Sequence, residues 1–221
     1  MTIKNLDRFI QNTEDPEINF AMAQEYESIG QTGSAISFYL RTAERSATDT
    51  QQYEALLRMA LCFEKQKTRD DTESVILQKA ICLLPKRPEA YFLLARLYEW
   101  RKMWHESYFV ATTGWNSVDF NVAPLQTDVQ YPGEYGILFQ KAVASWWVGN
   151  CDESRELFYH LKVSYKMNDM FTRAVDNNLK NRDVYGALIT ITRTNGFTGR
   201  MAVGYATSDG TAINGSDYTG T

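Results

Sequence analysis

The sequence predicts a mainly α-helical protein in which antiparallel helix pairs follow one another, with a short β segment after them. Over most of residues 1–182, apolar residues recur at three- and four-residue spacing, which places them on one face of a helix. Matching positions return after 35 residues, from Ala60 to Ala95, and this step indicates an internal repeat. After Asp183 the apolar residues alternate, as they do in strands. We therefore expect a helical domain at 1–182 and a β segment at 183–221.

The first helices are expected near the start of the chain, beginning with a short amphipathic helix over residues 3–12. Asp15-Pro16 marks the start of the first full pair, because proline is tolerated in a first turn, where its missing N–H is not needed. Gly30 is placed where this pair must reverse direction, often through a left-handed conformation. A second pair begins near Gln51. Its second helix is predicted to contribute Val75, Ile76, Ala80 and Leu83.

The third pair, from Pro88 to Ala111, has the clearest pattern, with a break near residues 102–104. One face of its first helix carries Tyr91, Leu94, Ala95 and Tyr98. On its second helix Ser107 and Ala111 are small, which suits a close approach of the two helices.

The periodic pattern stops after the third pair and returns later. Residues 116–132 contain two prolines and no helical period, so we expect a long loop or insertion there. A fourth, looser pair follows from Glu134 to Leu161, with its turn at Gly149-Asn150. A last helix near residues 168–181 is expected to cap the array, because an open terminal repeat exposes its apolar face. Its apolar residues are Met170, Phe171, Ala174, Val175 and Leu179.

The third pair carries the pattern large-x2-Leu-small-x2-aromatic, followed by small and aromatic residues, and it resembles the tetratricopeptide repeat. The resemblance implies an α-solenoid of antiparallel helix pairs over residues 1–182, in which the first helix of each pair lines a concave groove. By register with this family, the residues expected to face a partner are Phe20, Gln24, Leu57, Leu61, Phe92, Arg96, Phe139, Val143 and Trp146. Three carboxylates follow the same register, Glu27, Glu64 and Glu99.

Part of this apolar stripe must be core between neighbouring repeats, so the same residues also have a purely structural interpretation. The family's clamp for an acidic peptide C-terminus needs asparagine and lysine on this face. Gln24 and Leu61 stand where asparagine is wanted, and Arg96 is the one basic residue of the set. Capture of a terminal carboxylate is therefore not expected.

The tail has the chemistry of strands and turns. Strands are expected at 187–193 and 200–207, joined by a turn at Asn195-Gly196. The run from Tyr205 to Tyr218 resembles the Calx-beta motif, which implies the start of a longer β-sandwich, so we expect an incomplete β-hairpin fragment. Complete domains of this family can bind calcium. Asp209 matches a ligand position, but the other acidic ligands are missing, so calcium binding is not expected.

Composition excludes several classes of function. The net charge of −4 argues against nucleic-acid binding, which needs clustered Lys and Arg. No apolar run is long enough for a membrane span, and the start lacks an apolar signal core, so a cytoplasmic location is expected. Three widely spaced cysteines imply no disulfide framework and are expected to be small buried residues. These are Cys62, Cys82 and Cys151.

Catalytic motifs are also missing, so the chain is not expected to be an enzyme or to need a cofactor. It contains no Gly-rich phosphate loop, no Gly-x-Ser-x-Gly elbow and no His-Glu-x-x-His sequence. It has no Asp-x-Asp either, since Asp70-Asp71 are adjacent and are expected in a charged, solvated turn.

Three functions remain as hypotheses. The first is a non-catalytic scaffold whose groove takes an apolar or amphipathic segment of a partner protein. The second is an accessory region of a glycosyltransferase system, because residues 127–158 resemble helical repeats attached to such enzymes. The third is a calcium-binding adhesion module formed through the Calx-beta-like tail.

Overall fold

The computed structural model describes residues 3–182, and these residues contain ten helices. The chain divides into two units, Met1–Val184 and Tyr185–Thr221, and the described residues belong to the first. The helices are α1 (Leu6–Gln11), α2 (Pro16–Ser28), α3 (Thr32–Arg45), α4 (Asp49–Gln66), α5 (Asp70–Leu83), α6 (Glu89–Trp100), α7 (Trp104–Ser117), α8 (Glu134–Trp147), α9 (Cys151–Ser164) and α10 (Asp169–Arg182). The two strands predicted at 187–193 and 200–207 lie outside the described residues.

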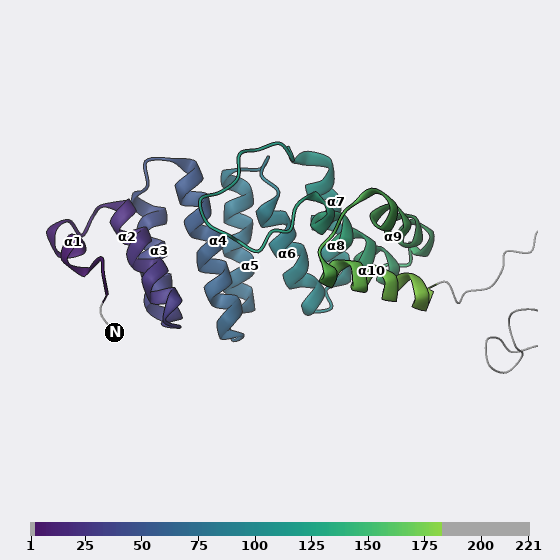
Figure 1. The fold of residues 1–221 in the computed structure, drawn as a ribbon, viewed down its shortest axis with the longest axis horizontal. Helices are drawn as coiled ribbons and strands as arrows, with labels where there is room; N and C mark the ends of the chain where they lie inside the picture. The colour runs from purple at the N-terminus through teal and green to yellow at the C-terminus, as the bar shows by residue number, and fades with distance from the viewer. Residues whose placement is uncertain (1–2, 183–221) are drawn as a thin grey trace, which may run out of the picture. The chain divides into compact units, whose positions relative to one another are not determined.

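The helices pack as sequential pairs, α2 with α3, α4 with α5, α6 with α7 and α8 with α9, and each pair contacts the next (Figure 1). This arrangement confirms the predicted order of helix pairs. The short helix α1 lies against α2 and buries no residue of its own. Asp15 accepts hydrogen bonds from the backbone N–H groups of Glu17 and Ile18, and Pro16 is the first helical residue, so α2 begins at the predicted cap.

Within each pair the chain reverses through one residue in the left-handed backbone region. These residues are Gly30, Lys67, Lys102 and Gly149, with φ of 77°, 54°, 57° and 92°. In the turn at Lys102, the N–H of Met103 donates to the carbonyl of Tyr98, which satisfies an orphan carbonyl at the end of α6. The same hydrogen bond recurs in the turns at Gly30 and Gly149, whereas at Lys67 the left-handed residue itself donates to Phe63 and Glu64. The left-handed turn predicted at Gly30 is confirmed. A left-handed residue in each of the four turns is a structural mark of the repeat.

Small residues let the two helices of a pair approach closely. Ala95 and Ser107 are completely buried, and the Ser107 hydroxyl donates to the Ala95 carbonyl at 2.9 Å. The same contact recurs in the fourth pair, where the Ser154 hydroxyl donates to the Ala142 carbonyl at 2.6 Å. A Cβ atom added at Gly114 would lie 2.8 Å from Tyr91 Cβ, so α7 can pack on α6 only with glycine there. The small residues predicted at this contact are confirmed, and Gly114 adds to them.

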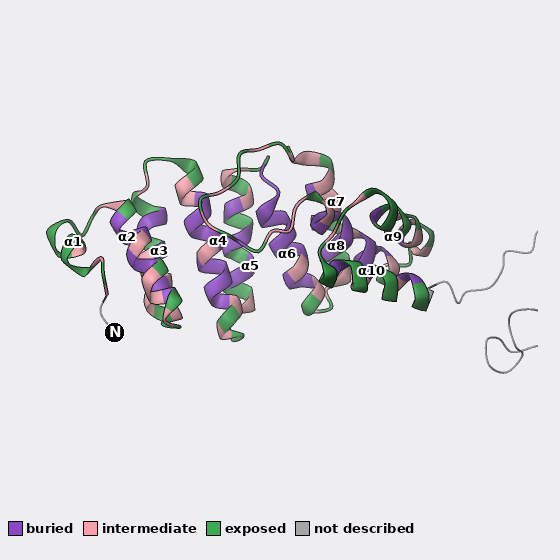
Figure 2. Cartoon of the chain, viewed as in Figure 1, coloured by how far each residue is buried: buried purple, intermediate pink, exposed green. Residues whose placement is uncertain are grey.

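The core lies between the helices, as the buried residues in Figure 2 show. Helix α10 closes the last pair by burying Phe171, Val175 and Leu179, which are spaced at four residues and share one face. The ring of Phe171 packs on that of Phe139 in α8, with centroids 5.0 Å apart. The predicted capping helix is therefore present. Within the described part of the chain, none of the helices combines the length and the apolar character that crossing a membrane requires.

Several predicted positions differ from the structure. Val75 is 62% exposed, because the buried face of α5 is formed by Ile76, Leu77 and Ala80, one step further around the helix. Met170 is 64% exposed, because the buried face of α10 is formed by Phe171, Val175 and Leu179.

The expectation of three small buried cysteines holds for one of them. Cys62 is buried, and burial raises the pKa of its thiol to about 12. Cys82 is exposed, and Cys151, the first residue of α9, is half-buried. The Asp70-Asp71 pair starts α5 rather than lying in a turn, and acidic residues there suit the positive end of a helix dipole.

Candidate functional site

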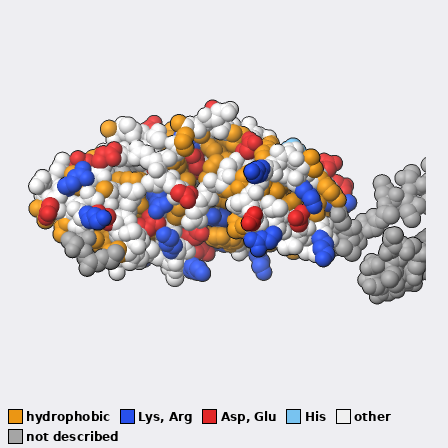
Figure 3. All heavy atoms as spheres, in the orientation of Figure 1, with side chains coloured by type: hydrophobic (Ala, Val, Ile, Leu, Met, Phe, Trp, Pro, Cys, Tyr) orange, Lys and Arg blue, Asp and Glu red, His pale blue; other side chains and the backbone are white. Residues whose placement is uncertain are grey.

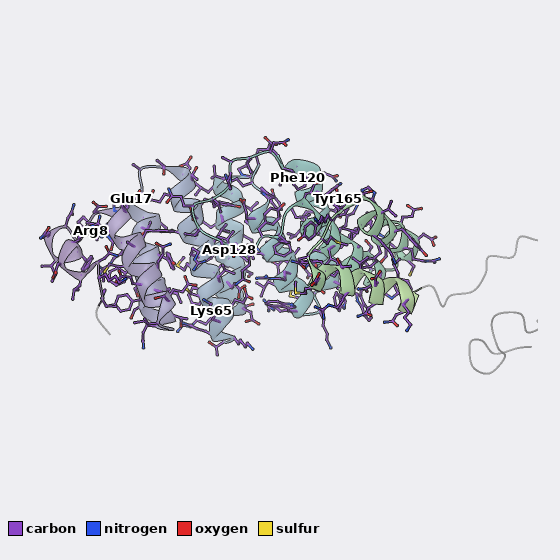
Figure 4. The ribbon with its side chains drawn as sticks, viewed as in Figure 1. Arg8, Glu17, Lys65, Phe120, Asp128 and Tyr165 are labelled. Atoms are coloured by element: carbon purple, nitrogen blue, oxygen red, sulfur yellow. The ribbon has the colours of Figure 1, made fainter. Side chains whose placement is uncertain are left out.

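Residues 118–133, between α7 and α8, form a loop that we call the crossing loop. We call the surface formed by α2, α4, α6 and α8 the first-helix face, which in arrays of this kind is the binding face. In Figure 1 the crossing loop runs back from the end of α7 over α4 to α6 before it enters α8. Figure 4 labels Asp128 where the loop passes α4, with Lys65 further along that helix. The predicted insertion therefore lies on the surface where a partner was expected.

Side chains of α4 hold the crossing loop through its backbone. The Glu54 carboxylate accepts hydrogen bonds from the N–H groups of Gln126 and Thr127. One guanidinium nitrogen of Arg58 donates to the carbonyl of Asp128 at 2.6 Å. An acceptor and a donor one helical turn apart on α4 therefore engage peptide groups of the loop between residues 125 and 129.

Helix α6 and the residues before it hold the other side of the loop. Arg87 donates to the carbonyl of Ala123 at 2.9 Å and pairs with Glu89. The ring of Tyr131 meets that of Phe92 edge-to-face, with centroids 5.8 Å apart, and Val129 is only 4% exposed. The middle of the first-helix face is thus covered by the chain itself.

A buried charge cluster supports this part of the face. Glu27 of α2 accepts hydrogen bonds from the Tyr39 hydroxyl at 2.8 Å and from the Lys65 ammonium at 2.7 Å, and it pairs with Arg58. Burial alone would raise the pKa of Glu27, but these hydrogen bonds and the Arg58 charge more than offset it, so the pKa lies below its usual value. Arg58 therefore joins α2 and α3 to the crossing loop.

An open cleft remains on the first-helix face between the crossing loop, α6, α8 and α10, and we call it the α6–α10 cleft. It has a volume of about 640 Å³. Its floor is aromatic, formed by Phe92, Phe139 and Phe171, all less than 9% exposed. Trp100 and Met170 border it and are 57% and 64% exposed. Figure 3 shows this side of the array, with acidic and basic side chains distributed over hydrophobic surface.

Arg96 is fixed inside the cleft. Its guanidinium pairs with Glu64 at 2.8 Å and donates to the Gln130 side chain of the crossing loop at 3.2 Å. It also lies over the rings of Phe92 and Trp100, at 5.4 Å and 4.9 Å from their centroids. The predicted basic residue is therefore present on this face, where it bonds to α4 and to the crossing loop.

Two acceptors sit beside Arg96. The Gln140 side chain of α8 is 3% exposed, and its amide hydrogen-bonds the carboxylate of Glu99. The carbonyl oxygen of the same amide is buried with no hydrogen-bond partner. Burial raises the pKa of Glu99, although the Gln140 hydrogen bond and the Arg96 charge act in the opposite direction.

Glu73 of α5 lies near this acidic region and is only 4% exposed. Burial raises its pKa to about 7, and the neighbouring charges of Glu64 and Asp70 act in the same direction. The charges of Arg96 and Arg101 lower the pKa without offsetting the burial. Glu73 therefore holds its proton more tightly in the folded chain than in the unfolded chain.

The fold is expected to lose stability as the pH rises from about 4.5 to about 7, the window between the unfolded and folded pKa values of Glu73. By pH 8 the loss attributable to this carboxyl should reach roughly 3 kcal/mol. Glu73→Gln removes the titration, so urea unfolding followed by circular dichroism should show the variant more stable than wild type at pH 8 and equal at pH 4.5. Glu156→Gln, on the exposed side of α9, is the control. Equal curves for wild type and Glu73→Gln at pH 8 would contradict the assignment.

The structure brings some of the predicted groove residues together and separates others. Phe92, Arg96 and Phe139 line the α6–α10 cleft. Leu57 and Leu61 are 0% and 2% exposed, so they belong to the core and offer a partner no surface here. The others lie outside the residues that line this cleft: Phe20 and Val143 are buried, Trp146 is half-buried, and Gln24 is exposed.

Sequence reasoning missed several residues of the cleft, among them Trp100, Tyr131, Gln140 and Met170. Trp100 ends the helix that carries Phe92 and Arg96, so helical spacing from those two residues could have found it. Tyr131 belongs to the insertion, and its position depends on how the loop folds back. In the described residues, no three or more His, Cys, Asp or Glu side chains gather to hold a metal ion, and Asp209 lies outside them.

Comparison with solved structures identifies the fold. The PilF structure from Pseudomonas aeruginosa has 9% sequence identity and a TM-score of 0.58, over 79% of this chain and 71% of that one. TTC0263, a thermophilic TPR protein of Thermus thermophilus, has 13% identity and a TM-score of 0.52, over 80% and 87%. The MamA protein has 16% identity and a TM-score of 0.53, over 84% and 85%. Residues 3–182 have the tetratricopeptide-repeat fold.

The tetratricopeptide array is joined to a second kind of sequence. The Calx-beta domain family matches residues 179–221, which confirms the resemblance found in the tail. The match begins inside α10, which continues to Arg182. No curated protein matches the chain. The calcium-binding and glycosyltransferase-associated hypotheses stay predictions, because the described residues of the array do not test them.

Proposed function

We propose that the tetratricopeptide array is a non-catalytic scaffold that binds an apolar or amphipathic segment of a partner protein in the α6–α10 cleft. The observation that carries the proposal is the exposure of Trp100 and Met170 at the edge of an aromatic pocket. Large apolar side chains exposed beside a concave pocket are typical of sites that bind a partner.

The crossing loop supports the same proposal, because it is a peptide segment already bound to the first-helix face. The Glu54 carboxylate accepts hydrogen bonds from N–H groups of the loop, and Arg58 and Arg87 donate hydrogen bonds to its carbonyl oxygens. The face therefore provides side chains that satisfy peptide groups lying across the helices. A partner segment entering the cleft would lie beside this loop and contact the aromatic floor.

The variant Met170→Glu is expected to weaken partner binding at least about tenfold, because it places a charge where an apolar contact forms. The measurement uses peptides selected from a random 12-residue display library on the full 221-residue chain, with affinity then measured by fluorescence anisotropy. Val75→Glu is the matched control, because Val75 is 62% exposed on a helix away from the cleft. Phe92 is unsuitable for this test, since it is buried and its loss would destabilise the fold.

The proposal fails if selection yields no peptide that distinguishes Met170→Glu from wild type while both variants remain folded. It also fails if Val75→Glu reduces binding as strongly as Met170→Glu. Circular dichroism of the three proteins checks that the helical content is unchanged.

A further inference from the structure

The charges around the α6–α10 cleft are unevenly distributed. Three carboxylates line it, from Glu64, Glu99 and Asp128, and Arg96 is the one cationic side chain among the lining residues. Arg96 is already engaged, because it pairs with Glu64 and donates to Gln130. The cleft therefore carries an excess of negative charge toward whatever enters it.

Two buried polar atoms of the cleft lack a hydrogen-bond partner, the carbonyl oxygen of Gln140 and the hydroxyl of Tyr131, and only the first lies on a side chain bonded to a carboxylate, that of Glu99. The carbonyl oxygen of Gln140 is buried and makes no hydrogen bond, although the residue is only 3% exposed. The amide nitrogen of the same side chain donates to the carboxylate of Glu99. Among the ion pairs of the described residues, none involves Glu99. Buried acceptors of this kind are normally satisfied by a donor from the protein or a ligand. The carbonyl oxygen of Gln140 can only accept, so the group missing beside it is a donor, and a cationic donor also suits the neighbouring Glu99 carboxylate.

We propose that the α6–α10 cleft selects a segment that carries a lysine or arginine side chain among apolar residues, with the cationic group placed between Glu99 and Gln140. This inference rests on the proposed function of the cleft and adds the charge of its partner. The apolar stem of a long basic side chain suits the aromatic floor that includes Phe92 and Phe139, while its charged end reaches the carboxylate of Glu99. An acidic segment would meet like charge, and the Arg96 charge is already paired with Glu64.

The test is a double-mutant cycle between the basic residue of a peptide and Glu99. Peptides are first selected on the full chain, and those whose binding is lost in Met170→Glu are kept, so each one is known to occupy the cleft. In each peptide, lysine is replaced by norleucine or arginine by citrulline. On wild type this change is expected to weaken binding about tenfold or more, as for a charge-assisted hydrogen bond. On Glu99→Gln the same change should cost less than about threefold, and Glu156→Gln should behave as wild type.

Each outcome decides the inference separately from the function on which it rests. Peptides that occupy the cleft but bind equally well without their basic residue overturn the charge preference and leave the scaffold function intact. Selected peptides that share acidic residues, or apolar residues alone, would likewise overturn the charge preference and leave the scaffold function intact. Failure to select any peptide sensitive to Met170→Glu overturns the proposed function and this inference with it. The neutral peptides are measured on wild type, so the result does not depend on Glu99→Gln being folded.

Discussion

Replacing Ala95 with tryptophan is expected to lower the free energy of unfolding by about 3 kcal/mol or more, because overpacking a tight helix contact strains both helices. Ala95 is completely buried, and the Ser107 hydroxyl reaches its carbonyl at 2.9 Å, so no space exists for an indole ring between α6 and α7. Ala60, which is 1% exposed, occupies the same repeat position in α4, and Ala60→Trp should have a similar effect.

Urea unfolding followed by circular dichroism measures this change. Val75→Trp is the matched control, because it introduces the same ring on an exposed face of α5 and should cost little. If Ala95→Trp and Val75→Trp unfold at the same urea concentration, the contact between α6 and α7 is not as close as the structure has it.

Removing the guanidinium of Arg58 is expected to destabilise the fold by about 3 kcal/mol at pH 7, as for one partner of a buried ion pair. In Arg58→Ala the Glu27 carboxylate keeps Lys65 and the Tyr39 hydroxyl, which places the cost at the lower end of the usual range. The crossing loop also loses the donor to its Asp128 carbonyl. The control is Arg45→Ala, whose pair with the 70% exposed Glu14 should contribute only about 0.5 kcal/mol.

The pH dependence of this effect has a defined sign. The pKa of Glu27 is lowered in the folded chain, so its contribution to stability is present above the unfolded pKa and is lost as the pH falls through the folded pKa. The difference in unfolding free energy between wild type and Arg58→Ala should therefore shrink in acid. A difference that stays constant from pH 7 down to pH 3 would contradict the assigned role of the carboxylate.

The helix pairs could be predicted because their information is local. The three- and four-residue spacing around Ala95 and the proline after Asp15 depend only on neighbouring residues, and the structure follows both. Val75 shows the limit of the same reasoning. Three apolar residues in a row, from Val75 to Leu77, cannot all lie on the buried face of one helix, and Val75 is the one that is exposed. Gly114 was missed because only the distance to Tyr91 reveals why the position needs glycine.

The candidate site could be predicted only in part. Phe92 and Arg96 follow from the repeat register, but the residues that shape the cleft around them do not. The loop is held on α4 mainly through backbone groups, with the Thr127 hydroxyl as a side-chain donor to Glu54, and these contacts join residues more than 70 positions apart, beyond the reach of local spacing. Met170 was recognised as part of a capping helix, whereas its exposure depends on how that helix is rotated against α9.

The crossing loop also changes how cooperatively this array can fold. A solenoid with contacts only between neighbouring repeats behaves as a one-dimensional chain, in which an end repeat can open by itself. Here Glu54 and Arg58 of the second pair hold a segment that follows the third pair and precedes the fourth. These contacts raise the contact order, so the loop can dock only after the helices on both sides of it have formed. Three consecutive pairs are thus tied into one cooperative unit, and opening of the second pair alone would expose Glu54 and Arg58 together with the loop.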